Sequence, residues 1–187
     1  RPRDQALAAA QICHRLDGIP LAIELAAARA NLLSPEQIAA RLDDLFRLLV
    51  GGSRTALPRQ QTLRALIDWS YDLLSEEEKR LLQFASVFAG GWNLEELEAV
   101  SGESRALELL EQLINKSLVV PEERESEMRY FMLETIRQYA REKLFEAKAS
   151  TLARDRHFAY FDSLAEKLWE GYRSPDGLAF RDRAEDE

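Results

Sequence analysis

The chain has 187 residues, of which 46% are hydrophobic and 31% are charged, with only eight glycines and six prolines. This composition is typical of one or two globular domains and excludes low-complexity chains. The formal net charge is −8, and residues 57–187 carry the excess acid because residues 1–56 are close to neutral. An acidic chain favours protein partners over nucleic acid or an anionic membrane surface.

Cysteine content and hydropathy exclude further classes. Cys13 is the only cysteine, so an internal disulfide and a cysteine-rich zinc site are excluded. No apolar run reaches the roughly 18 residues that span a bilayer, and no signal peptide is visible. We therefore expect a cytoplasmic protein without membrane contact. Because the sequence opens with Arg-Pro-Arg-Asp and stops in a helical pattern, we expect a piece of a longer protein.

The first third of the chain predicts a helical subdomain over residues 1–56. Residues 4–16 have an apolar stripe at helical spacing, and an almost uniformly apolar helix extends to about Ala30. Between them, Gly18 can end the first helix in a left-handed conformation and Pro20 suits the first turn of the next. We expect a stiff corner between two helices here.

A third helix and a linker complete this subdomain. Ser34 is a helix cap, Pro35 takes the first helical position, and Gln37 can close a capping box. The helical apolar spacing then continues to Leu49. Residues 50–60 contain two glycines and a proline, which predicts a linker.

The middle of the chain predicts a winged helix over residues 57–147. Helices are expected at 62–74, after the capping box that begins at Ser75, at 94–100 behind an Asn93 cap, and at 105–115 behind a Ser104 cap. One face of the helix at 105–115 is expected to be apolar and to include the following residues: Leu107, Leu110, Leu113 and Ile114.

A β-hairpin follows these helices. We expect strands at 118–120 and 129–133, joined by a solvated acidic loop at 122–127. Helices followed by a hairpin are the winged-helix arrangement, so the predicted fold class is mainly α with one small hairpin as the wing. From Leu94 to Lys116, six acidic residues stand against two basic ones. We therefore expect that this winged helix does not bind duplex DNA, whose phosphates require Lys and Arg.

Residues 148–187 are expected to begin a further helical region. A helix over about 151–170 would carry Phe158, Phe161, Leu164, Leu168 and Trp169 along one side. No repeat of fixed period emerges, so the class of this region stays open, with a tetratricopeptide-like repeat as one option. The three tryptophans, Trp69, Trp92 and Trp169, are expected to be core anchors.

Four stretches in this order resemble the NB-ARC type of STAND ATPases, which includes bacterial regulators. Gly18-Ile19-Pro20-Leu21 is similar to the Gly-x-Pro-Leu motif of that family. Residues 59–74 resemble the first helix of its winged-helix subdomain, residues 84–92 its bend, and residues 132–140 its Met-His-Asp segment. The resemblance covers about residues 6–145 and implies a helical subdomain, a winged helix and the start of a sensor region.

The resemblance also implies a nucleotide site. Gly18, Pro20 and Leu21 would approach the adenine, with Pro20 packing on the base. Leu133 and Glu134 occupy the positions of the family's histidine and aspartate at the phosphate side. Leucine cannot donate a hydrogen bond to phosphate, which is a departure from the family. Glu134 is either a switch residue or a cap for the following helix, and the sequence leaves both open.

The sequence contains no Gly-x-x-x-x-Gly-Lys-Ser/Thr loop and no acidic pair for magnesium. We therefore expect no enzyme activity and no cofactor in this chain, whereas the intact parent would bind ADP or ATP with magnesium. Its partners would be an upstream P-loop domain and downstream sensor repeats of the same chain, with homo-oligomers on activation.

The sequence leaves three functions open. The first is a regulatory segment of a STAND-family regulator that contacts nucleotide from the lid side and relays a conformational change. The second is a DNA-binding winged helix of a transcription regulator. The third is a protein-interaction scaffold whose nucleotide site has decayed. A catalytic pair of Cys13 and His14 is disfavoured, since neighbours in a helix point about 100° apart and no third group is evident.

Overall fold

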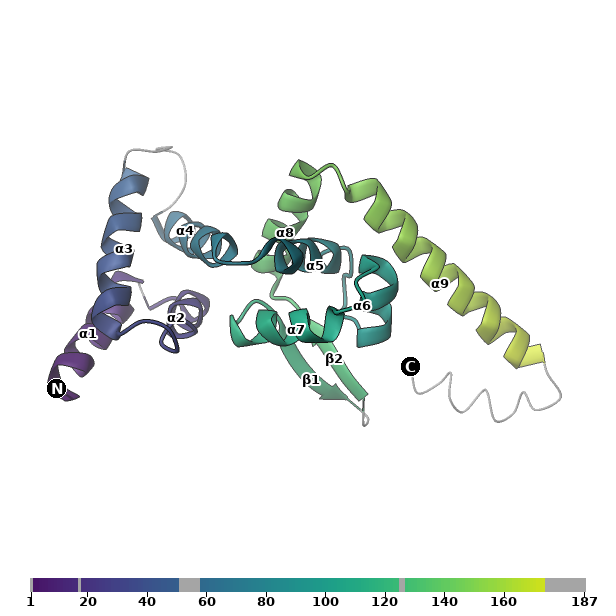
Figure 1. Ribbon diagram of the computed structural model, residues 1–187, viewed down its shortest axis with the longest axis horizontal. Coiled ribbons are helices and arrows are strands. Elements are labelled where there is room, and N and C mark those ends of the chain that lie inside the picture. Colours follow the sequence, from purple (N-terminus) through teal and green to yellow (C-terminus); the bar gives the residue numbers. More distant parts are fainter. Residues whose placement is uncertain (1, 17, 51–57, 125–126, 174–187) are drawn as a thin grey trace.

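The computed structural model describes residues 2–16, 18–50, 58–124 and 127–173. The chain is mainly helical with one small antiparallel sheet, as the sequence predicts. Figure 1 shows three parts in a row: a helical bundle, a winged helix, and a long final helix that leaves the body at an angle. Buried apolar side chains from all three parts form one continuous core cluster.

The bundle contains α1 (Pro2–Arg15), α2 (Pro20–Ala27) and α3 (Pro35–Val50). The predicted corner is confirmed: Gly18 has φ 66°, its N–H donates to the Cys13 carbonyl, and Pro20 is the first residue of α2. The helix α2 ends at Ala27, three residues before the expected end. There the backbone tightens into shorter-range bonds, with the Arg29 N–H donating to the Ala26 carbonyl.

The helix α4 (Pro58–Asp72) connects the bundle to the winged helix. It starts at Pro58, earlier than predicted, because proline suits the first helical position. The remainder of the predicted linker, residues 51–57, lies outside the described residues. The box at Ser34 is confirmed, since the Gln37 N–H donates to the Ser34 hydroxyl and the Gln37 side chain accepts from the Ser34 N–H. Since α4 packs on α2 and α3, the two subdomains are in direct contact.

The winged helix consists of α5 (Glu76–Ala85), α6 (Leu94–Ser101), α7 (Ala106–Asn115), β1 (Val120–Arg124) and β2 (Glu127–Phe131). Complete capping boxes start α5, at Ser75 and Glu78, and α6, at Asn93 and Glu96. Trp92 forms an isolated antiparallel bridge to Tyr130, so the segment before α6 is bonded to β2 of the hairpin. Helix, bridge, two helices and hairpin are the order of a winged helix.

The predicted hairpin is present, but the bounds of its strands and the extent of its loop differ from the prediction. The strands pair from Val120 with Phe131 to Arg124 with Glu127, so most of the expected acidic loop is strand. Charged side chains are tolerated here because the strands stand out from the body and their residues are mostly exposed. Pro121 lies within β1, as an edge strand permits.

The prediction for α7 was wrong in two respects. The residue before its first turn is Arg105, which makes no side-chain cap, so Ser104 does not cap this helix. Leu107 is 57% exposed, although it was expected on the apolar face. The helix instead buries its other apolar positions, which recur at three- and four-residue spacing. These buried residues are Ala106, Leu109, Leu110 and Leu113.

The helix α8 (Glu134–Glu146) returns across α4 and α5. The Tyr139 hydroxyl donates to the Asp68 carboxylate at 2.6 Å, and Arg64 bridges to Glu142 at 2.7 Å. Burial, and then the Asp68 hydrogen bond, raise the pKa of Tyr139. These contacts fix the start of the final helical pair onto α4, which also contacts the bundle.

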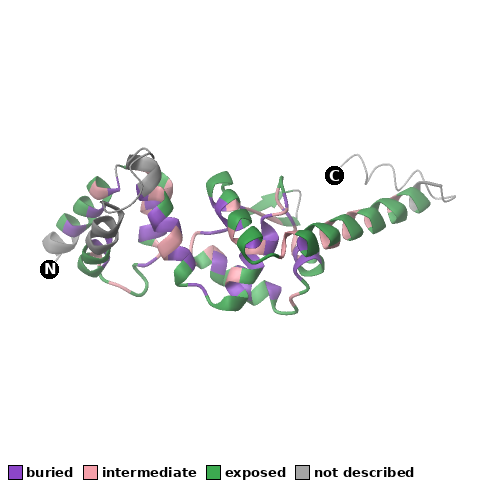
Figure 2. Cartoon of the chain, turned by 90° about the horizontal axis from the view of Figure 1, so that it is seen from above, coloured by how far each residue is buried: buried purple, intermediate pink, exposed green. Residues whose placement is uncertain are grey.

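The helix α9 (Ser150–Arg173) packs on α6 only near its start. Arg156 donates to the Val100 and Ser101 carbonyls, and the His157 ring lies 5.1 Å from that of Phe88. Figure 2 shows mostly exposed residues along the rest of α9. The expected apolar side is therefore incomplete, because Phe158 is 71% exposed.

Of the three predicted tryptophan anchors, Trp92 is buried, Trp69 is half-buried and Trp169 is 62% exposed, so that prediction fails for Trp169. None of the described helices is both long and apolar enough to cross a membrane. The helix α9 continues beyond the expected end near residue 170 to Arg173, and residues 174–187 lie outside the described residues.

Candidate functional site

The five residues predicted to contact nucleotide lie in two separate parts of the chain. Gly18 and Pro20 are exposed at the corner before α2, with Leu21 half-buried behind them. Leu133 and Glu134 lie where β2 leads into α8. Within the described residues, no hydrogen bond or ion pair joins the two groups. Their use as one nucleotide site stays a prediction.

The start of α8 has its own internal charge pair. Leu133 occupies the cap position without a side-chain cap and is 37% exposed. The Glu134 carboxylate accepts from Arg137 at 2.7 and 2.8 Å and from Gln138 at 2.9 Å. These hydrogen bonds, that of Arg137 first, lower the pKa of Glu134 to about 2. Glu134 is thus a carboxylate bound to its own helix, and no phosphate donor lies at Leu133.

The exposed face of α7 is the surface that a DNA-reading winged helix places in the major groove. This face is acidic and polar with one apolar side chain. Its exposed residues are Leu107, Glu108, Glu111, Gln112 and Asn115. Glutamate side chains repel the phosphates of DNA, so this surface lacks the charge expected for nucleic acid.

Both basic residues at the ends of α7 are already paired. Arg105 bridges to Glu108 at 2.9 Å and to Glu77 at 3.3 Å. Lys116 bridges to the buried carboxylate of Glu78 at 2.5 Å. These ion pairs hold the ends of α7 on α5 and leave little positive charge for a polyanion.

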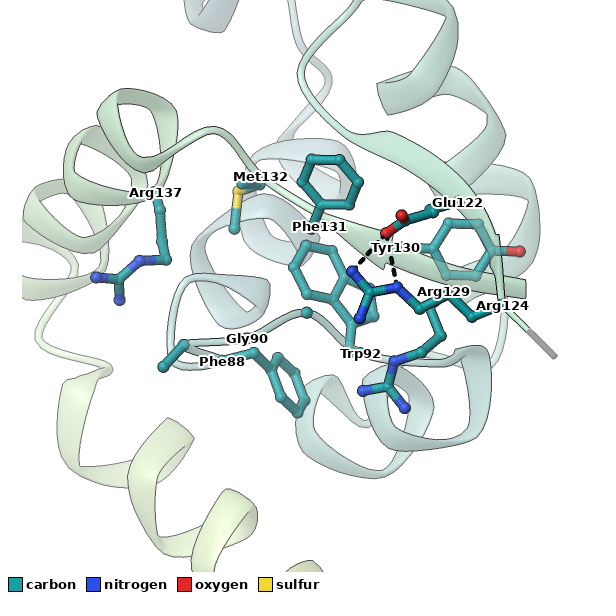
Figure 3. A pocket seen from close by; sticks show the side chains of 12 residues that line it. Phe88, Gly90, Trp92, Glu122, Arg124, Arg129, Tyr130, Phe131, Met132 and Arg137 are labelled. Carbon is teal, nitrogen blue, oxygen red and sulfur yellow. Dashed lines mark hydrogen bonds and ion pairs between the residues drawn. The ribbon is translucent and has the colours of Figure 1, made fainter. Parts of the chain in front are cut away.

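A cavity of about 370 Å³ lies behind the wing (Figure 3). Its walls come from the bend at residues 88–92, from both strands of the wing, and from Arg137 at the start of α8. Three arginines and one glutamate line it: Arg124, Arg129, Arg137 and Glu122. This concentration of positive charge is unusual in a chain of net charge −8.

The structure also reveals polar groups that the sequence reading missed. Arg29 is 2% exposed, and its Nε and Nη2 atoms have no hydrogen-bond partner among the described residues. Its guanidinium lies 6.0 Å from the Trp69 ring. Burial lowers the pKa of Arg29, and the charge of Glu78 opposes this effect. An arginine in an otherwise mainly apolar stretch of sequence was the available signal for this buried charge.

Comparison with known proteins supports the winged-helix assignment. Residues 74–145 match the family model described as "Winged helix-turn-helix domain". This span includes α5, α6, α7, the hairpin and most of α8. The match and the observed order of elements agree on a winged-helix fold for this part of the chain.

Two mycobacterial proteins are similar over most of this chain. A protein of Mycobacterium tuberculosis named "Putative HTH-type transcriptional regulator" is 48% identical over 168 residues, which are 87% of this chain and 19% of that protein. An "Uncharacterized protein" of the same species is 44% identical over 150 residues, which are 77% of this chain and 38% of that protein. The chain thus spans about a fifth of the length of the regulator.

One solved structure matches over 87% of this chain and 23% of its own length. It is a signal transduction ATPase with numerous domains (STAND) that has a tetratricopeptide repeat sensor, from Pyrococcus horikoshii. The identity is 19% and the TM-score is 0.45. At these values the likeness adds nothing to the winged-helix assignment, which rests on the family model and on the order of elements.

Proposed function

We propose that this chain is a segment of a transcription regulator in which the winged helix makes protein contacts and relays a conformational change. The single observation that carries this proposal is the acidic exposed face of α7, where Glu108 and Glu111 are exposed and Arg105 is already paired with Glu108. Support for a regulatory role comes from the names of the longer mycobacterial relatives.

The arrangement of ion pairs favours a packing role. Arg105 and Lys116 bind α5, so α7 is fixed from both ends onto the domain's own scaffold. Leu107 remains exposed in the first turn of α7, on the same face as Glu108 and Glu111. An apolar residue beside carboxylates suits a protein surface with an apolar contact and basic surroundings.

DNA binding is the second candidate, and the comparisons favour it. Both the matching family model and the names of the relatives refer to a helix-turn-helix domain. A regulator of that type requires a DNA-reading surface, and α7 has the position of a recognition helix. The two candidates predict opposite results in one assay.

The test is fluorescence anisotropy of labelled mixed-sequence duplexes with this chain at low salt. We expect no binding at micromolar protein. The matched control is the double variant with Glu108→Lys and Glu111→Lys, which should acquire weak, salt-sensitive binding because lysines replace the repelling charges. Micromolar binding by the unaltered chain that weakens steeply with added salt would establish the DNA-binding candidate instead.

A nucleotide-switch role remains a finer proposal for the longer parent. It is supported by the resemblance of four motifs and by Pro20, whose exposed ring could pack on an adenine base. The side chains of the other predicted residues do not suit a phosphate, because that of Leu133 has no donor and Glu134 is a carboxylate already bound by Arg137. Loss of ADP affinity by about fivefold on Pro20→Ala in the parent, measured by calorimetry, would support the contact.

A scaffold with a decayed nucleotide site is the remaining alternative. It shares the protein-contact role of the winged helix but needs no ligand-dependent change. Calorimetric titration of the parent with ADP distinguishes the two, since a scaffold of this kind would bind none. In either case we expect this chain alone to show no nucleotide hydrolysis above a buffer blank.

A further inference from the structure

The cavity behind the wing adjoins the predicted phosphate-side positions without including them, since Met132 and Arg137 line it. Leu133 and Glu134 are not among its lining residues. Its volume of about 370 Å³ is within the range of small-molecule sites, which is roughly 300–1,000 Å³. The cavity is therefore large enough for a small organic ligand.

The three arginines that line the cavity differ in how closely they are paired with acidic residues of the chain. Arg124 bridges to Glu122 at 2.8 Å, and Arg137 is held by Glu134 at 2.7 Å. Arg129 has only Glu96 at 3.9 Å and donates no hydrogen bond within the described residues. Its guanidinium therefore retains a planar set of donors that suits a carboxylate or another oxyanion.

Neutral donors line the same cavity. The backbone N–H groups of Ala89, Gly90 and Gly91 make no hydrogen bond to any described residue. Trp92 also lines the cavity, but its side chain is 1% exposed and its Nε1 is buried, so the indole reports on the cavity wall and does not donate to a ligand. Successive backbone N–H groups also form anion-binding concavities.

Apolar side chains fill the remaining wall. Figure 3 shows Phe131 and Met132 between Arg137 on one side and the pair of Arg124 and Arg129 on the other. Phe131 is half-buried and thus still accessible. A ligand held at Arg129 would have its body on this aromatic and thioether surface.

We propose that the cavity binds a small organic acid with a flat apolar body. The anionic group would bind Arg129 and the backbone N–H groups of residues 89–91, and the body would lie against Phe131, which is backed by the buried Met132. This proposal does not depend on whether the winged helix binds protein or DNA, since α7 does not line the cavity.

The test is a titration of the chain with naphthoate, followed in two-dimensional amide NMR spectra. We expect saturable shifts of the Gly90 and Gly91 amide signals and of the Trp92 indole signal. Arg129→Gln should weaken binding about tenfold because a charge-assisted pair is lost, while Arg129→Lys should retain part of the affinity. The matched control is Arg141→Gln, on the outer surface of α8, which should leave the affinity unchanged.

Two further ligands test the anionic contact and the apolar contact separately. Naphthamide has the same body without the charge and should bind far more weakly, and equal binding would overturn the anionic site. Inorganic phosphate has the charge without the body, and binding as tight as that of naphthoate would overturn the apolar contact. Absence of saturable shifts at millimolar naphthoate, or equal weakening by Arg129→Gln and Arg141→Gln, would overturn the site itself.

Discussion

The first turns of α5 and α6 are built alike but connect differently to the rest of the domain. Each begins with a complete capping box whose glutamate, Glu78 or Glu96, is buried. Each glutamate faces a cation from another element. The distance is 2.5 Å from Glu78 to Lys116 at the end of α7, but 3.9 Å from Glu96 to Arg129 on β2.

The two glutamates therefore differ in role. Glu78 connects two helices, whereas the cation that faces Glu96 remains available to a ligand. Glu78 uses one oxygen for its own helix and the other for Lys116, so α5 and α7 are joined through one carboxylate. Glu96 caps α6 in the same way but makes no hydrogen bond to Arg129 among the described residues. The α7 side of the domain is thus internally paired, while the wing side retains a cation for a ligand.

The largest effect that we expect comes from the α5 junction. Glu78→Ala removes the reciprocal cap and leaves Lys116 without its carboxylate, and should lower the free energy of unfolding by about 3 kcal/mol. Glu96→Ala removes a cap alone and should cost about 1 kcal/mol. Urea unfolding measures both. Equal losses would contradict the distinction between the two junctions.

A second restraint holds the wing side of the domain, at Gly91. This residue has φ 96°, and an added Cβ would lie 2.8 Å from the Tyr130 carbonyl oxygen that accepts from the Trp92 N–H. Gly91→Ala should therefore destabilise the domain by about 2 kcal/mol. The matched control is Gly90→Ala, since nothing lies within 4 Å of a Cβ there. A thermal melt should show a lower midpoint for Gly91→Ala only.

Replacing the cation of each pair, Lys116 or Arg129, should change stability less than the substitutions above, and it compares the two pairs directly. Lys116→Met leaves one oxygen of the buried Glu78 unpaired and should cost about 1.5 kcal/mol. Arg129→Met should change stability by less than about 0.5 kcal/mol, because a pair at 3.9 Å contributes little. Urea unfolding of both variants is the measurement. A larger loss for Arg129→Met would show that this arginine is structural and not available to a ligand.

Local signals predicted the element order of the fold. The corner at Gly18 and Pro20 and the boxes at Ser34 and Ser75 depend on residues within a few positions of one another, so the sequence displays them directly. The hairpin register depends on pairing between two chain segments. Because residues 122–127 are mostly acidic, they were predicted to be a loop, although most of them lie in the strands. The cap of α7 was predicted wrongly because serine favours cap positions, but Ser104 lies one residue before Arg105, which occupies the cap position.

The candidate site was predictable only in part. Net acid around α7 follows from composition, and so does the expectation against DNA binding. The cavity does not, because it brings Gly90 and Arg137 together from parts of the chain that are almost fifty residues apart. The sequence shows the charge of Arg129, but only the structure shows that its nearest ion-pair partner, Glu96, is 3.9 Å away. The exposure of Leu107 depends on which stripe of α7 meets the core.

The start of α8 offers a third glutamate, and it differs from the other two because its cation lies on its own helix and its carboxylate is exposed. Arg137, and then Gln138, lower the pKa of Glu134 from an ordinary 4.5 to about 2. A lowered carboxyl pKa favours the folded state above pH 4.5, and this contribution is lost as the pH falls toward 2. Carbon NMR of the Glu134 carboxyl group during an acid titration should show this low pKa.

Variants of its partners test the cause of that shift. Arg137→Gln should return the pKa of Glu134 most of the way to 4.5, because it removes the two charge-assisted hydrogen bonds. Arg141→Gln is the matched control, since Arg141 makes the last of the contributions and should move the pKa little. Glu134→Gln should flatten the acid limb of stability between pH 4.5 and 2. A pKa that stays near 2 in Arg137→Gln would mean that this pair is not what holds the carboxylate, and would free Arg137 for the cavity that it lines.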